Sequence, residues 1–179
     1  MTIKILVLDT GTEILHGFLT HKIIKENAPE NTIVTPLKVT DNAGHTTNEH
    51  LARGLVHAYQ NNYDIVNISL GLPTMTKQVS DILKRLEEHN IIVVASAGNN
   101  YSCYPAKHPS VISVGSYEPN NPTEPADYTP NCYDVLENGA YSYKDRTYYG
   151  TSYATAYYSA ILAQRLLSER SNDNNGKQH

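Results

Sequence analysis

Three residue types that together can activate a nucleophile occur far apart in this chain. Asp9 follows the apolar run at residues 3–8, His16 comes seven positions later, and Ser152 stands at the end of Gly150-Thr151-Ser152. A serine hydroxyl is a poor nucleophile until a base removes its proton. A histidine serves as that base because its pKa lies near neutrality, and a carboxylate orients the imidazole and stabilises its protonated form. Each residue alone is common in loops, so only a fold that joins them predicts chemistry.

The elements that must position these residues follow from the hydrophobic pattern. Short apolar runs rich in branched residues predict strands at residues 3–8, 32–39, 64–70, 91–96 and 111–114. Apolar residues at helical spacing predict helices between and after them, the second of which follows a cap at Asn48. Their stripes are Phe18, Leu19, Ile23 and Ile24; Leu51, Leu55 and Ala58; Val79, Ile82, Leu83 and Leu86; and Ala154, Tyr158, Ile161, Leu162 and Leu166.

Strands that alternate with helices predict an α/β fold with a mostly parallel central sheet. Ligands bind such sheets at the carboxyl ends of the strands. Asp9 follows the first predicted strand, and Gly98-Asn99 follows the fourth, so both point to the same edge. Residues 116–131 are rich in turn formers and predict a surface loop.

The sequences around these residues resemble the subtilase family of serine peptidases. The resemblance rests on the chain order Asp, His, Ser and on Val7-Leu8-Asp9-Thr10-Gly11, His16-Gly17, Ala97-Gly98-Asn99 and Gly150-Thr151-Ser152. It extends from residue 3 to about residue 167. It implies a subtilisin-like three-layer fold in which helices flank the sheet, a peptidase domain over residues 1–170, and a polar tail over residues 171–179, which we expect to be disordered.

The resemblance also implies a function. We expect a serine endopeptidase that hydrolyses peptide bonds through an acyl-enzyme, with Asp9, His16 and Ser152 as its triad. Asn99 and the backbone N–H of Ser152 would donate to the oxyanion. His21 lies in the same motif, but the alignment of His16-Gly17 with the family's His-Gly favours His16.

Substrate-binding residues are implied in the same way. Ser69, Leu70 and Gly71 would pair with an extended peptide. Ala97 and Gly98 would form the opposite wall of the first specificity pocket, with Cys103 near its base. His45, in Gly44-His45-Thr46, would lie on the other peptide-pairing edge.

The chain departs from the family pattern near the site. The link from Asp9 to His16 is short, Tyr149 stands where a small serine is usual, and Tyr153 and Ala156 replace a methionine and a proline. We expect restricted specificity, such as the processing of a peptide or precursor. The alternative is a catalytically impaired peptide-binding or regulatory subunit, and an esterase or acyltransferase is a third reading.

Composition limits the remaining classes of function. The 179 residues suit one domain, 40% are hydrophobic, and the net charge is −4. No basic stripe favours nucleic acid and no apolar run is long enough to span a membrane. Asp41 and Asp127 are isolated, so no metal and no cofactor is expected. The start lacks the features of a signal peptide, which predicts a cytoplasmic protein.

Three further points stay open at this stage. Cys103 and Cys132 are read as reduced thiols, with a bridge between them as the alternative. Eight of the 14 tyrosines fall between residues 133 and 158, where they suit either a wet peptide groove or a half-exposed core edge. A peptide or protein is the expected substrate, and a second copy or a partner subunit could complete the reduced scaffold.

Overall fold

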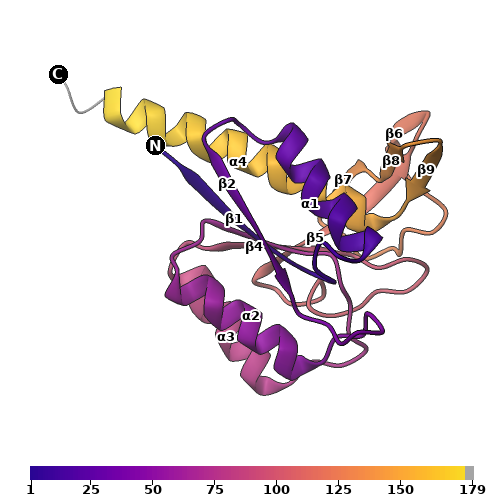
Figure 1. Cartoon of the computed structure of the whole chain (residues 1–179), viewed down its shortest axis with the longest axis horizontal. Coiled ribbons are helices and arrows are strands. Elements are labelled where there is room, and N and C mark those ends of the chain that lie inside the picture. Colours follow the sequence, from indigo (N-terminus) through magenta and orange to yellow (C-terminus); the bar gives the residue numbers. More distant parts are fainter. Residues whose placement is uncertain (176–179) are drawn as a thin grey trace.

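The computed structural model describes residues 1–175, and side chains through residue 173. Seven strands form one sheet in the order β2-β1-β3-β4-β5-β6, with β7 also paired to β5 (Figure 1). These strands are β1 (Ile3–Asp9), β2 (Thr32–Lys38), β3 (Ile65–Ile68), β4 (Ile92–Ser96), β5 (Val111–Glu118), β6 (Asn121–Pro125) and β7 (Val135–Asn138). All neighbours run parallel except β5 and β6.

Two helices cover each face of this sheet, which confirms the three-layer α/β fold expected from the sequence. In Figure 1, α1 (Leu15–Asn27) and α4 (Thr151–Asn175) lie on one side, and α2 (Asn48–Gln60) and α3 (Lys77–Glu88) lie on the other. Strand β1 feeds both cores because successive side chains point to opposite faces. Ile5 and Val7 pack with α1 and α4, while Leu6 and Leu8 pack with α2 and α3. Burial on both sides explains why the strand is almost continuously apolar.

The five predicted strands are all present, with ends that shift by a few residues. The predicted loop at residues 116–131 was wrong in its first part, since β5 continues to Glu118 and pairs with β6 in antiparallel register. The expected cap of α2 was also wrong. Thr47 caps the helix and accepts a hydrogen bond from the His50 N–H at 3.2 Å. The Asn48 side chain instead bonds to the backbone of Thr74 and Thr76.

The sequence did not predict a small hairpin that precedes the last helix. It consists of β8 (Ala140–Tyr143) and β9 (Arg146–Tyr149), which pair in antiparallel register. The hairpin leads directly through Gly150 into α4. It therefore stands next to Ser152, at the edge of the sheet where the candidate residues meet.

The last helix runs further than the expected domain boundary at residue 170. Helix α4 continues to Asn175, and the Ser171 hydroxyl donates to the Leu167 carbonyl at 2.8 Å within it. The rest of the predicted tail, residues 176–179, lies outside the described residues. Over residues 1–175, no helix is long and apolar enough to cross a membrane. Cys103 is buried and Cys132 is exposed, and both are free thiols.

Candidate active site

Asp9 and His16 meet because a tight turn joins β1 to α1. Asp9 is the last residue of β1, and α1 begins at Leu15. Gly11 takes a positive φ of 82° in this turn. A Cβ on Gly17 would overlap the Gly11 carbonyl oxygen, so only glycine lets the helix approach so closely. The Gly17 N–H donates to the Thr10 hydroxyl at 3.0 Å, so the short link is sufficient to bring the two side chains together.

The Asp9 carboxylate is buried and has a partner on each oxygen. Oδ1 accepts from the Thr10 N–H at 2.6 Å and lies 2.8 Å from His16 Nδ1. Oδ2 accepts from the Thr20 hydroxyl at 2.8 Å. Only 2% of the Asp9 side chain is exposed. The carboxylate is therefore fixed by hydrogen bonds and holds the imidazole through Nδ1, which leaves Nε2 to face other groups.

The charge state of His16 follows from burial and from Asp9. Burial of the ring lowers the pKa, whereas the hydrogen bond and the negative charge of Asp9 raise it. The net pKa of His16 is raised above its ordinary value. Such an imidazole is a stronger base than a free histidine side chain, and its protonated form is stabilised by the neighbouring carboxylate.

Ser152 lies in the first turn of α4 and faces the loop after β3. Its hydroxyl donates to the Ser69 carbonyl at 3.2 Å, and the Ser69 hydroxyl donates back to the Ser152 carbonyl at 3.2 Å. The N–H of Ser152 has no intrahelical acceptor, because it belongs to the first turn. The positive end of the helix dipole therefore lies beside the serine hydroxyl and favours a developing negative charge.

Asn99 is held in a fixed orientation opposite Ser152. It follows Gly98, whose φ of 108° turns the chain after β4. The Asn99 Oδ1 accepts from the Thr151 N–H at 3.1 Å and from the Thr151 hydroxyl at 3.2 Å. With its oxygen engaged in this way, the amide Nδ2 is the group that can donate to a ligand at Ser152.

A cavity of about 500 Å³ joins these residues. His16, Asn99 and Ser152 line it, as do Thr10, Gly44, Ser69, Leu70, Gly71, Leu72, Pro73, Ser96, Gly98, Tyr101, Cys103 and Thr151. Most predicted peptide-binding residues therefore lie on its wall. Ala97 is buried behind the wall, and its N–H donates to the Val114 carbonyl at 2.9 Å. His45 is 80% exposed beside Asp41, and its neighbour Gly44 lines the cavity instead.

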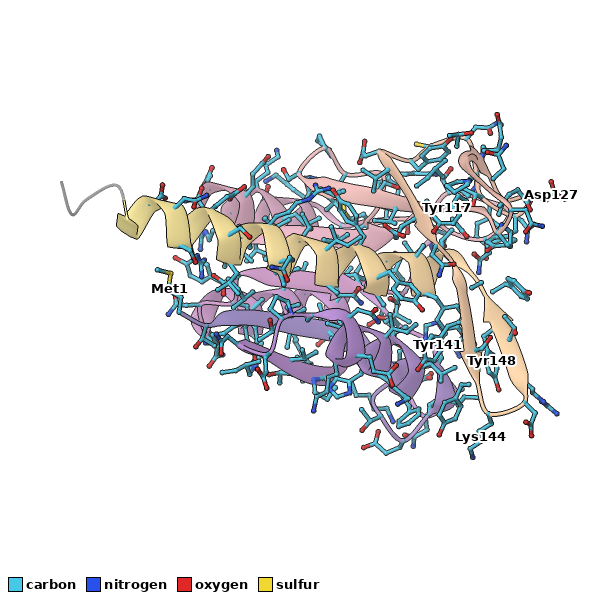
Figure 2. The ribbon with its side chains drawn as sticks, turned by 90° about the horizontal axis from the view of Figure 1, so that it is seen from above. Met1, Tyr117, Asp127, Tyr141, Lys144 and Tyr148 are labelled. Atoms are coloured by element: carbon cyan, nitrogen blue, oxygen red, sulfur yellow. The ribbon has the colours of Figure 1, made fainter. Side chains whose placement is uncertain are left out.

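Sequence reasoning missed the aromatic support of His16. The Tyr153 ring lies 5.9 Å from the His16 ring, centroid to centroid, and 6.4 Å from the Tyr148 ring of the hairpin. Tyr141 donates to the Glu26 carboxylate of α1 at 2.7 Å. Figure 2 shows Tyr141 and Tyr148 on the hairpin, with Lys144 at its tip. The local excess of tyrosine was the available signal, and these contacts favour the core-edge reading for Tyr141, Tyr148 and Tyr153.

The protonation of Tyr141 depends on burial and on its partner Glu26. Burial, followed by the hydrogen bond and charge of Glu26, strongly raises the pKa of Tyr141, so its hydroxyl remains a donor to α1.

Among residues 1–175, no group of three or more His, Cys, Asp or Glu side chains is arranged to hold a metal ion.

The sequence of this chain is similar to those of known serine peptidases called subtilisins. Residues 20–175 match the model of a family described as the subtilase family. The chain is similar to subtilisin E of Bacillus subtilis (strain 168), with 31% identity over 144 residues that cover 71% of this chain and 37% of that protein. It is equally similar to a subtilisin of Bacillus pumilus, of which the match covers 51%. The match thus covers 37% of the length of the first of these two relatives and 51% of the length of the second.

Solved structures show a similar fold. The self-cleaved protease domain of PatA superposes with a TM-score of 0.77 at 23% identity, covering 96% of this chain and 82% of that one. The prenylagaramide maturation protease PagA superposes with a TM-score of 0.73 at 19% identity, covering 90% and 73%. At these identities the superpositions describe the fold alone. The family match begins at residue 20, after Asp9 and His16, so the assignment of these two residues depends on the local geometry.

Proposed function

The chain belongs to the subtilase family, and from this premise we propose that it is a serine endopeptidase with Asp9, His16 and Ser152 as its triad. The observation that carries the proposal is the hydrogen bond between Asp9 and His16 at the rim of the cavity that Ser152 also lines. The link between them is short, yet Gly11 and Gly17 allow the two side chains to meet.

The first step of the proposed reaction is proton transfer from Ser152 to His16. With its Nδ1 proton donated to Asp9, His16 presents an unprotonated Nε2 to the cavity. In the structure the Ser152 hydroxyl donates to the Ser69 carbonyl. It must turn toward His16 when a peptide enters, and catalytic hydrogen bonds commonly tighten only in the occupied site. Asp9 then stabilises the imidazolium that forms.

The second requirement is a donor set for the oxyanion. Attack on the peptide carbonyl places negative charge on its oxygen. The Asn99 amide and the Ser152 N–H are the donors that border this part of the cavity. Removing one such donor costs about 3–4 kcal/mol of transition-state stabilisation in a subtilisin, which is a member of the family to which this chain belongs. When the oxyanion collapses, the C–N bond of the peptide breaks and His16 gives its proton to the leaving amine. The acyl-enzyme that results is hydrolysed by water with His16 again as the base.

We further propose restricted specificity, such as the processing of one peptide or precursor. The exposed Tyr149, which precedes Gly150 at a position where the family usually has a small serine, supports this proposal. PagA, one of the structural neighbours, is itself a maturation protease. A peptide or protein segment is the proposed partner, bound in extended form along Ser69–Gly71. A cytoplasmic location and assembly with a second copy or subunit remain predictions from the sequence.

One observation favours a second candidate function. The Ser152 hydroxyl is bonded to Ser69 rather than to His16. If a peptide does not release that bond, the chain would bind peptides without cleaving them and act as a regulatory subunit.

A fluorophosphonate probe separates the two functions. The wild type should gain the mass of one probe, whereas Ser152→Ala and His16→Ala should gain none, as read by intact mass spectrometry. A folded wild type that takes no probe would refute the peptidase and support the binding function.

A further inference from the structure

The loop that carries Asn99 is exposed, so its conformation depends on hydrogen bonds more than on packing. Asn99 and Asn100 both face solvent, and Asn100 takes a positive φ of 70°, which asparagine tolerates better than most residues. The Asn99 side chain is bonded to the N–H of Thr151 at 3.1 Å. On the other side of the loop, the Asn100 N–H donates to the Tyr128 carbonyl at 2.6 Å. Tyr128 therefore holds the residue that follows the proposed oxyanion donor.

The turn that contains Tyr128 is anchored on strand β5. The Ala126 N–H donates to the Ser116 carbonyl at 2.8 Å, and the Thr129 hydroxyl donates to the same carbonyl at 2.9 Å. The Thr129 hydroxyl also accepts from the Ser116 N–H at 3.0 Å. Ser116 is fully buried in the sheet. The Tyr128 carbonyl is thus a fixed acceptor for the loop that carries Asn99.

The hydroxyl of Tyr128 reaches the chain that leads into α4. It donates to the Ser116 hydroxyl at 2.8 Å, and the backbone of Gly150 also hydrogen-bonds to it. The Gly150 N–H donates to the Gly139 carbonyl at 3.0 Å, and Gly139 packs so closely on Ser116 that a Cβ there would overlap its hydroxyl. Since Gly150 comes two residues before Ser152, the Tyr128 hydroxyl helps to hold the turn that places the proposed nucleophile.

Two donors stabilise an oxyanion together only if both lie at hydrogen-bond distance from the same oxygen. We propose that Tyr128 is a positioning residue that fixes the distance between the Asn99 amide and the Ser152 N–H. Its carbonyl holds the loop of Asn99, and its hydroxyl holds the turn before Ser152. Tyr128 lies outside the lining of the cavity, so it acts through these two neighbours and not on the substrate. This inference rests on the proposed function, since it names a residue that supports the same site.

The kinetic test uses Tyr128→Phe, which removes the hydroxyl and keeps the ring. Peptide hydrolysis should show kcat lowered about 10-fold and KM changed by less than about 2-fold, because the oxyanion forms only in the transition state. In an Asn99→Ala background the same change should lower kcat by less than about 2-fold, whereas a merely structural role would lower it by the same factor in both backgrounds. Ser116→Ala removes the acceptor and should reproduce Tyr128→Phe. Tyr133→Phe, in the same segment but at a different cavity, is the matched control.

Amide hydrogen exchange tests the same tie without hydrolysis. By NMR, the Asn100 N–H of Tyr128→Phe should exchange about 10-fold faster than in the wild type, while the Ala97 N–H, which donates to the Val114 carbonyl within the sheet, should be unchanged. The inference is overturned if Tyr128→Phe, shown to be folded by its thermal melt, keeps the wild-type kcat, loses it equally in both backgrounds, or leaves the exchange of Asn100 unchanged. A wild type that neither cleaves a peptide nor takes the fluorophosphonate overturns the proposed function, and the exchange of Asn100 then decides whether Tyr128 fixes the loop.

Discussion

Replacement of Asp9 by asparagine tests how the carboxylate acts, because its two oxygens face different kinds of partner. Oδ1 faces the Thr10 N–H and His16 Nδ1, while Oδ2 faces the Thr20 hydroxyl. The backbone N–H can only donate, whereas the hydroxyl can also accept. An asparagine should therefore turn its oxygen toward Thr10 and His16 and its NH₂ toward Thr20. The Thr20 hydroxyl already has the Gly17 carbonyl as a second acceptor at 3.1 Å, so His16 should keep its tautomer.

The expected loss is then that of the charge alone. A unit charge about 4 Å from the imidazolium contributes about 4 kcal/mol at an effective dielectric constant near 20. Since about 1.4 kcal/mol changes a rate tenfold, Asp9→Asn should lower kcat by about 10³-fold. An inverted tautomer would cost about 10⁴-fold. The pKa of His16 should also fall, because burial remains while the negative charge of Asp9, which raises the pKa, is lost.

A double-mutant cycle with Thr20→Val separates these outcomes. Thr20→Val alone removes the hydroxyl that donates to Asp9 Oδ2 and to the Gly17 carbonyl, at a cost of about 1 kcal/mol for a shared hydrogen bond. Combined with Asp9→Asn, it also leaves the amide NH₂ without an acceptor. The loss of transition-state stabilisation in the double variant should therefore exceed the sum of the losses in the two single variants. Peptide hydrolysis between pH 5 and 9 gives kcat and the acid limb of the profile, which should move to lower pH in Asp9→Asn. Additive losses, or a single loss of 10⁴-fold or more, would refute the proposed orientation of the asparagine.

Three other predictions concern His16, Gly17 and His108, the last of which is buried away from the site and hydrogen-bonds to Ser80 of α3. In the wild type, the acid limb of the kcat/KM profile should lie above pH 6.5 because the pKa of His16 is raised. Tyr153→Ala exposes the His16 ring and weakens the effect of burial, which lowers this pKa, so the acid limb should move to higher pH. An unchanged acid limb would count against the packing of Tyr153 on His16. Burial lowers the pKa of His108 below 6.5. The neutral ring therefore stabilises the folded state relative to the unfolded one above pH 6.5, and this stabilisation is lost as the pH falls through the folded-state pKa. The free energy of unfolding in urea should decrease accordingly from pH 8 to pH 5, and His108→Asn should flatten this dependence. Gly17→Ala places a methyl group against the Gly11 carbonyl and should destabilise the fold by about 2 kcal/mol, or roughly 4–8 °C in Tm; an unchanged melting temperature would contradict the close approach.

Much of the main sheet could be predicted because its strands are buried on both faces. Residues such as Ile5 and Val66 belong to continuous apolar runs, and a parallel sheet requires such runs. The positions of Asp9 and Asn99 followed from the same logic, since Asp9 ends β1 and Asn99 lies in the loop after β4. The family motifs then connected them to His16 and Ser152.

The features that the sequence did not predict depend on contacts between residues that form no local pattern in the sequence. The hairpin β8–β9 is short and half-exposed. It is anchored by the hydrogen bond from Tyr141 to Glu26 and by the contact between the rings of Tyr148 and Tyr153. Those partners are distant in sequence or come from another element, so periodicity does not indicate them. The placement of His45 outside the cavity likewise depends on the turn at Asp41, whose carboxylate accepts the His45 N–H at 2.9 Å.

The position of α4 has a consequence for biosynthesis. Asp9 and His16 precede Ser152 in the chain by more than 130 residues, on β1 and α1, whereas Ser152 lies in the first turn of α4. Helix α4 packs across β1, β3, β4 and β5, so it completes one hydrophobic layer at the same time as it places the proposed nucleophile. Proteins that depend on contacts of such long sequence separation fold slowly. The proposed hydrolytic activity would therefore arise only after α4 has been synthesised and has packed on the sheet.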